Sequence, residues 1–190
     1  MRKSLIALLL LILSPMGVAD PDVPDYASIL LQTTEGDIVI ELDGRRAPIT
    51  VGNFLKLVDS GYYNGTIFHR VIPDFMIQGG GFNRDLDEKE PDDTIANESG
   101  NGLTNLRGTV VMARSSDPHS AIAQFFINVA DNRALNPKPD RWGYAVFGYV
   151  TKGMDVVDKI SNARSGPAGR FKQDVPVVPV IITRASRVTA

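Results

Sequence analysis

Hydrophobic and polar residues alternate along two neighbouring segments near the start of the chain. The side chains of Ile38, Ile40 and Leu42 fall on one face, and the positions between them are mostly polar. A period of two residues is typical of a half-buried β-strand. This segment, Asp37–Leu42, follows a similar run over Ser28–Thr33 across a turn that contains a glycine. The two segments therefore predict a β-hairpin.

The period changes to that of a helix over Pro48–Ser60. Four apolar residues there fall at i, i+3, i+4 and i+7 and so share one helical face: Val51, Phe54, Leu55 and Val58. A proline suits the first turn of a helix, and the glycine that follows this segment suits its end. The apolar spacing of Met154, Val157 and Ile160 predicts a shorter second helix.

The remaining apolar segments are short and strand-like. They are Thr66–Ile72, Phe75–Gln78, Val110–Ala113, Phe125–Val129, Ala145–Val150 and Val177–Thr183. From Gly79 to Gly108 the chain is rich in Gly, Asp, Asn and Glu, which predicts a long irregular loop that starts with a tight bend at the three consecutive glycines. Many short strands with two isolated helices predict a mainly β domain, an all-β barrel with helical plugs.

The first 19 residues have the layout of a secretory signal peptide. Arg2 and Lys3 precede nine apolar residues, Leu5–Leu13, and small residues come just before Asp20. Nine residues rise only about 14 Å as a helix, whereas a bilayer core is roughly 30 Å thick, so a permanent membrane anchor is disfavoured. We expect export to the periplasm, or alternatively secretion, and no stable membrane insertion after the signal is removed.

The predicted domain boundaries follow from this pattern. After the signal peptide over 1–19 we expect a flexible leader over 20–27, one folded domain over 28–187 and a tail over 188–190. The whole chain has 190 residues, which is the usual size of a single domain.

Composition excludes several classes of function. The chain has 20 basic and 22 acidic residues, so it lacks the positive charge with which proteins bind nucleic acids. It has no cysteine and only two histidines, which excludes disulfide frameworks, iron–sulfur clusters and zinc fingers. We predict neither a metal site nor a cofactor.

Arg70 is the first residue that suggests chemistry. Strand alternation places it on the same face as Phe68 and Ile72, among apolar neighbours. A guanidinium there keeps its charge and needs an acceptor, such as Gln78, to hold it. The alternative is an exposed arginine at a sheet edge.

A second mixed cluster lies in a later strand. Gln124, Phe126 and Asn128 alternate onto one face and combine amides with an aromatic ring. The alternative is an ordinary core strand.

Several ordered blocks of sequence resemble the cyclophilin family. The blocks are Phe68–Gly80, Val111–Arg114, Gln124–Asn128 and Val146–Gly148. The similarity runs from about Ser28 to about Thr183, and the variant present is similar to the exported bacterial branch. The resemblance implies a closed eight-stranded antiparallel barrel capped by two α-helices, with peptidyl-prolyl cis–trans isomerase activity.

The resemblance also implies roles for individual residues. Arg70 matches the catalytic arginine, and Gln78 matches the glutamine that holds it and contacts the substrate. The matches to the walls of the proline pocket and the groove beside it are Phe75, Met76, Phe126, Leu135, Ala113 and Gln124. Tyr144 stands where many members have a histidine, and Arg114 replaces an asparagine of eukaryotic members.

The implied reaction needs no nucleophile, metal or general base, because rotation about an X–Pro bond breaks no covalent σ-bond. Stabilisation of the twisted imide by Arg70 in an apolar pocket is the expected mechanism. The expected partners are proline-containing segments of unfolded or exported polypeptides, bound by a monomer. Two alternatives stay open: a module that binds proline peptides, chaperone-like, without significant catalysis, and a barrel that carries a small apolar ligand.

Overall fold

The computed structural model of this protein describes residues 23–89, 91 and 93–188. The predicted signal peptide over 1–19 lies outside the described residues, as do the first three residues of the predicted leader over 20–27 and the last two of the tail over 188–190. The first strand begins at Tyr26, within the range predicted for the leader, because Tyr26 and Ala27 already pair with the neighbouring strand.

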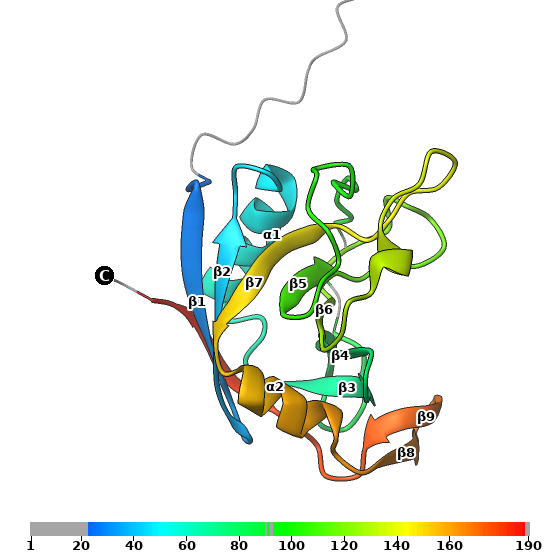
Figure 1. Cartoon of the computed structure of the whole chain (residues 1–190). Helices are drawn as coiled ribbons and strands as arrows, with labels where there is room; N and C mark the ends of the chain where they lie inside the picture. Colours follow the sequence, from blue (N-terminus) through cyan, green and yellow to red (C-terminus); the bar gives the residue numbers. More distant parts are fainter. Residues whose placement is uncertain (1–22, 90, 92, 189–190) are drawn as a thin grey trace, which may run out of the picture.

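Short strands dominate the described part of the chain. In chain order the elements are β1 (Tyr26–Thr33), β2 (Gly36–Asp43), α1 (Pro48–Asp59), β3 (Thr66–Ile72), β4 (Met76–Asn83), β5 (Thr109–Met112), β6 (Phe125–Asn128), the 3-10 turn η1 (Arg133–Leu135), β7 (Val146–Lys152), α2 (Met154–Ser161), β8 (Ser165–Ala168), β9 (Phe171–Pro176) and β10 (Ile182–Arg187). Figure 1 shows α1 near one end of the sheet, and α2 with the β8–β9 hairpin at the other.

Eight of these strands form one antiparallel sheet in the order β10-β1-β2-β7-β5-β6-β4-β3. Its two outer strands meet, because the Phe68 amide donates to the Val180 carbonyl (2.9 Å) and the Gly65 amide donates to the Ile182 carbonyl (2.8 Å). These bonds almost close the sheet into a barrel. The predicted mainly β, eight-stranded antiparallel barrel with two α-helices is confirmed.

Aromatic side chains fill the interior of the barrel. The α1 residue Phe54 contacts the rings of Tyr63, Phe125 and Phe147 at centroid distances of 4.8, 5.5 and 5.2 Å. The apolar face predicted for α1 is buried in this core, as are Val157 and Ile160 of α2. A core filled with rings disfavours the alternative in which the barrel carries a small ligand.

The predicted tight bend and loop beginning at Gly79 are wrong over their first residues, since β4 continues to Asn83. The register with β3 shifts within this stretch. Gly80 has a φ of +87°, and a Cβ there would lie 2.9 Å from the Tyr63 ring and 3.2 Å from that of Phe125. The glycines therefore let an irregular strand pass directly over core rings.

The end of the chain also differs from the prediction. The closing strand is β10, Ile182–Arg187, instead of Val177–Thr183, and the β8–β9 hairpin precedes it. Val177 and Val178 are exposed, and the prolines on either side of them have no amide to donate to a sheet. Pairing with β1 stabilises β10 despite its two arginines. Hydropathy alone therefore predicts the closing strand in the wrong part of this region.

Candidate active site

A second hydrophobic cluster lies on the outer face of the barrel. Phe125 and Ile127 of β6 point into the main core, whereas Phe126, between them, packs outward with Met76, Val111 and Val146. All four residues of β6 are buried, and on its outer face Leu135 and Tyr144 pack against the cluster that contains Phe126. The predicted alternation of β6 is thus confirmed, and its outer face forms part of a site.

A cavity of about 140 Å³ opens beside this outer cluster. Its walls combine aromatic, aliphatic and polar side chains: Arg70, Phe75, Met76, Gln78, Ala113, Arg114, Phe126, Leu135 and Tyr144. The rings of Phe126 and Tyr144 meet edge to face at 5.8 Å. Apolar and aromatic side chains combined with a few convergent polar groups, here Arg70, Gln78 and Arg114, are the usual lining of a small binding site.

Asparagine side chains hold the walls of this cavity in place. The Asn132 amide donates to the Phe75 carbonyl (2.8 Å) and to the Asn128 side chain (2.7 Å). The Leu135 amide donates to the Asn132 carbonyl (2.9 Å), and the Tyr144 amide donates to the Leu135 carbonyl (3.0 Å). The segment over 128–135 is therefore fixed to Phe75 on one side and to Tyr144 on the other.

Arg70 reaches the cavity because β3 contains a bulge. Phe68 pairs with Gly79 and Arg70 pairs with Gln78, so β3 advances by two residues where β4 advances by one. The extra residue, His69, reverses the alternation. The predicted common face of Phe68 and Arg70 is therefore wrong, since Phe68 lies in the main core while Arg70 lines the outer cavity.

The acceptor beside Arg70 also differs from the expected one. Gln78 lies opposite Arg70 in the sheet, but its side-chain amide donates to Gln124 (3.0 Å). Within the described residues, no hydrogen bond joins Gln78 to Arg70. The Nε atom of Arg70 instead lies 3.8 Å from the Asp174 carboxylate of β9. The arginine side chain is 41% exposed at the rim of the cavity.

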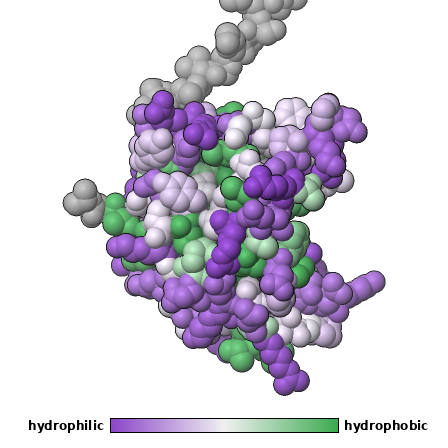
Figure 2. Space-filling model, in the orientation of Figure 1, coloured by the Kyte–Doolittle hydropathy of each residue, from purple (hydrophilic) through white to green (hydrophobic). Residues whose placement is uncertain are grey.

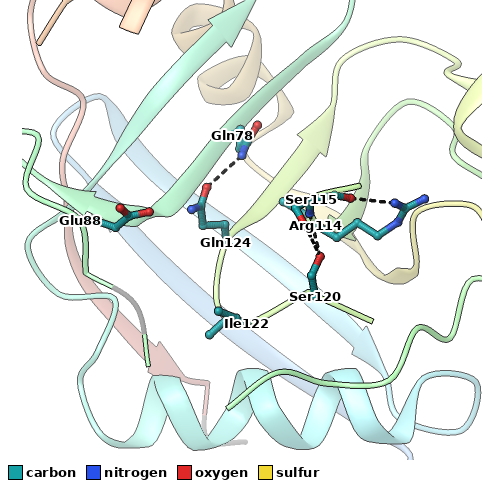
Figure 3. Close-up of a pocket in the computed structure, with 8 residues that line it drawn as sticks. Gln78, Glu88, Arg114, Ser115, Ser120, Ile122 and Gln124 are labelled. Atoms are coloured by element: carbon teal, nitrogen blue, oxygen red, sulfur yellow. Dashed lines mark hydrogen bonds between the residues drawn. The ribbon is translucent and has the colours of Figure 1, made fainter. Parts of the chain in front are cut away.

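A larger hollow of about 320 Å³ adjoins the cavity and shares Gln78, Ala113 and Arg114 with it. Figure 3 shows Gln78 and Gln124 joined between Glu88 and the loop that carries Arg114. The guanidinium of Arg114 lies 4.6 Å from the Tyr144 ring centroid and donates to the carbonyls of neighbouring loop residues. The cavity and the hollow are therefore neighbouring parts of one lined region of the surface.

In residues 23–89, 91 and 93–188, no three His, Cys, Asp or Glu side chains cluster in a way that would hold a metal ion. No helix of the same residues is long and apolar enough to cross a membrane.

Comparison with known proteins identifies the family. Residues 28–187 match the family described as "Cyclophilin type peptidyl-prolyl cis-trans isomerase/CLD". The chain belongs to the cyclophilin-type peptidyl-prolyl cis–trans isomerases. It is thus an enzyme of this class, as its similarity to curated isomerases also indicates.

Two bacterial relatives of this cyclophilin illustrate the similarity. It is 57% identical over 162 residues to peptidyl-prolyl cis-trans isomerase cyp18 of Streptomyces antibioticus, covering 84% of this chain and 97% of the relative. It is 53% identical over 157 residues to peptidyl-prolyl cis-trans isomerase A of Dickeya dadantii, covering 83% and 82%. A solved cyclophilin from Cryptosporidium parvum superposes with a TM-score of 0.70 at 27% identity, covering 87% of this chain and 99% of that one.

The structure brings the predicted site residues of this cyclophilin together. Eight of the nine line the smaller cavity, and the ninth, Gln124, lines the adjoining hollow. Arg114 of the cavity lining and Asp174 beside Arg70 are absent from the predicted set. Arg114 had a signal, since it departs from the asparagine of eukaryotic members, whereas nothing near Asp174 in the sequence marks it as a partner of Arg70.

Proposed function

We propose that this cyclophilin accelerates X–Pro rotation by donating a hydrogen bond from Arg70 to the prolyl nitrogen of the twisted imide. In the planar imide the nitrogen lone pair is delocalised into the carbonyl, whereas at half rotation it becomes an acceptor. Arg70 then interacts more strongly with the transition state than with either planar isomer. The observation that carries the proposal is the place of Arg70 in the lining of a cavity that also contains Phe75, Met76 and Phe126.

Arg70 is not sufficient by itself. The barrier to rotation is roughly 18–20 kcal/mol, and uncatalysed exchange takes about 10–100 s. Exchange within a millisecond requires a barrier lower by about 5.5–7 kcal/mol. A charged hydrogen bond contributes about 1.5–3 kcal/mol, so the cavity must supply the remainder.

The size and lining of the cavity suit that contribution. Its volume is about 140 Å³. An apolar cavity of about 150 Å³ in another protein accommodates benzene, so a pyrrolidine ring fits a space of this size. Phe75, Met76 and Phe126 would remove water from the imide, and loss of water favours the less polar twisted form. The aromatic walls are therefore part of the catalytic arrangement.

Substitution of Arg70 tests the proposal. We expect Arg70→Ala to lower kcat/KM about 10- to 100-fold, which is the share of one charged hydrogen bond, and to weaken peptide binding less than threefold. Arg70→Lys should also be slow, because an ammonium lacks the planar fork of a guanidinium. The measurement is NMR exchange and titration on a short Ala-Pro peptide.

The matched control is Arg184→Ala, which removes an exposed arginine of β10 outside the cavity lining and should keep the wild-type rate. Equal losses of binding and turnover in Arg70→Ala would refute the role of Arg70. A wild-type protein that binds the peptide without accelerating its exchange would instead support the alternative, a proline-peptide binding module.

We further propose that the substrates are proline-containing segments of exported, unfolded polypeptides and that the enzyme acts as a monomer in the periplasm. The layout of residues 1–19 supports export. The face seen in Figure 2 is mostly hydrophilic, with hydrophobic areas separated by polar side chains, which supports the monomer.

A further inference from the structure

We propose that Asp174 is a positioning residue for Arg70: its carboxylate orients the guanidinium so that the terminal nitrogens face the proline cavity. The inference rests on the proposed role of Arg70. The Nε atom of Arg70 lies 3.8 Å from the Asp174 carboxylate, which is an ion pair but is too long for a hydrogen bond. Within the described residues, no hydrogen bond engages the two terminal nitrogens of Arg70.

The β8–β9 hairpin is a separate element that brings this carboxylate to the site. Its two strands pair only with each other among the described strands. In Figure 1 the hairpin lies beyond β3 at the end of the molecule that also carries α2. Asp174 therefore belongs to an element outside the eight-stranded sheet, whereas Arg70 belongs to a strand of that sheet.

Aromatic and ionic contacts anchor the hairpin beside β3. The Phe171 ring contacts His69 at 5.5 Å and Phe82 at 5.1 Å. Arg170 lies 4.6 Å from the Phe82 ring centroid and pairs with Glu88 at 2.8 Å. Glu88 is thus paired with Arg170 of the hairpin, and the carboxylate within ion-pair distance of Arg70 is that of Asp174.

The backbone at Asp174 supports a functional role. Its φ is +69°, in the left-handed region that residues other than glycine rarely adopt. Among the described residues only Asp74 and Leu86 share this feature outside glycine. Strained backbone of this kind is often found at functional sites. The Asp174 carboxylate also accepts a hydrogen bond from the side chain of Gln173 (3.1 Å), which restricts its own rotation.

A half-exposed arginine benefits from such a partner. Its long side chain samples many rotamers in water, and all but the productive one must be given up before the guanidinium reaches the imide. A carboxylate at Nε restricts these rotamers before the substrate binds, which lowers the entropic cost of the transition state. Loss of Asp174 should therefore slow turnover more than it weakens peptide binding.

Removal of the carboxylate without new backbone strain provides the test. Asp174→Gly suits a φ of +69° and should lower kcat/KM about tenfold, with KM for the Ala-Pro peptide changed less than twofold. Asp174→Asn keeps an acceptor oxygen and tolerates the same backbone, so it should lose only about threefold; it also serves if the glycine variant does not fold. The matched control is Asp158→Asn, which breaks the Arg107 ion pair at α2 and should leave turnover unchanged.

A double variant separates this inference from the proposed function. With Arg70→Ala already present, Asp174→Gly should cause no further loss, because its effect requires the guanidinium. An equal further loss in that background, or wild-type turnover in Asp174→Gly, would overturn the positioning role while leaving that of Arg70 intact. Wild-type turnover in Arg70→Ala would instead contradict the proposed function. NMR of the Arg70 Nε–H group in the free enzyme should show sharper, more protected signals in wild type than in Asp174→Gly.

Discussion

Two consecutive residues of β3 have opposite environments. His69 is 2% exposed and lies against the rings of Phe82 and Phe171, whereas Arg70 lines the outer cavity. Burial is the main cause that lowers the pKa of His69 to about 4, and the positive charge of Arg70 contributes to this lowering. One bulge therefore separates a neutral packing residue from the proposed catalytic cation.

The depressed pKa of His69 predicts a pH-dependent stability. An unfolded histidine has a pKa of about 6.5, so between about pH 6.5 and 4 the unfolded chain binds a proton that the folded protein does not. The free energy of unfolding should fall by up to about 3 kcal/mol as the pH drops through this window. His69→Phe, which keeps a ring against Phe82 and Phe171, should flatten this dependence in urea titrations.

The matched control is His119→Gln, at the exposed second histidine, which should keep the wild-type slope. All three proteins have the same carboxylates. The difference in slope between the wild type and His69→Phe therefore gives the contribution of His69. A wild-type slope in His69→Phe would show that this histidine is not the responsible group.

At the scale of elements, α1 depends on a distant residue for its N-terminal cap. Ala47 precedes the helix and has no side chain with which to cap it. The Glu98 carboxylate, from the long loop after β4, accepts hydrogen bonds from the amides of Ile49 (3.1 Å) and Thr50 (2.8 Å). It also accepts one from the Thr50 hydroxyl (2.7 Å), so this one side chain ties the loop to the helix.

We therefore predict that Glu98→Ala lowers the free energy of unfolding by about 1–2 kcal/mol, the usual cost of a lost cap. Glu98→Gln retains an acceptor oxygen and should cost less. Urea denaturation measures both values. An unchanged midpoint for Glu98→Ala would mean that water replaces the carboxylate at the helix end without loss.

At the scale of the whole molecule, the barrel closes without a covalent link. The chain has no cysteine, so no disulfide joins its ends. The closing bonds join the β3 region to residues 180–182, which lie far away in the sequence. Because these contacts are non-local, the chain loses loop-closure entropy before it gains their stabilisation.

Export gives a prediction at the same scale. The full chain, expressed in a Gram-negative host, should be recovered from the periplasmic fraction as a monomer whose first residue is Asp20, leaving 190 − 19 = 171 residues. N-terminal sequencing and light scattering measure this. Replacement of the apolar run over 5–13 by polar residues should keep the chain uncleaved in the cytoplasm. A wild-type chain that still begins at Met1 would contradict the prediction.

Local periodicity was sufficient for much of the fold. The apolar stripe of α1 and the alternation of β2 and β6 each depend on neighbours within a few residues, and the structure has all three. Periodicity failed for β10, where two arginines hide the strand, and for β4, where glycines suggest a loop. The strand β10 pairs with the distant β1 and the end of β4 pairs with the neighbouring β3, and in both cases this pairing outweighs local preference.

The sequence by itself determined the mainly β class, the position of α1 and, through its ordered blocks, which side chains make the cavity. Only the tertiary structure decided how Arg70 is held. The bulge at His69 depends on the register between β3 and β4, and the contact with Asp174 depends on where the β8–β9 hairpin docks. Register and docking are set by the total free energy of contacts between distant segments, which no local pattern contains.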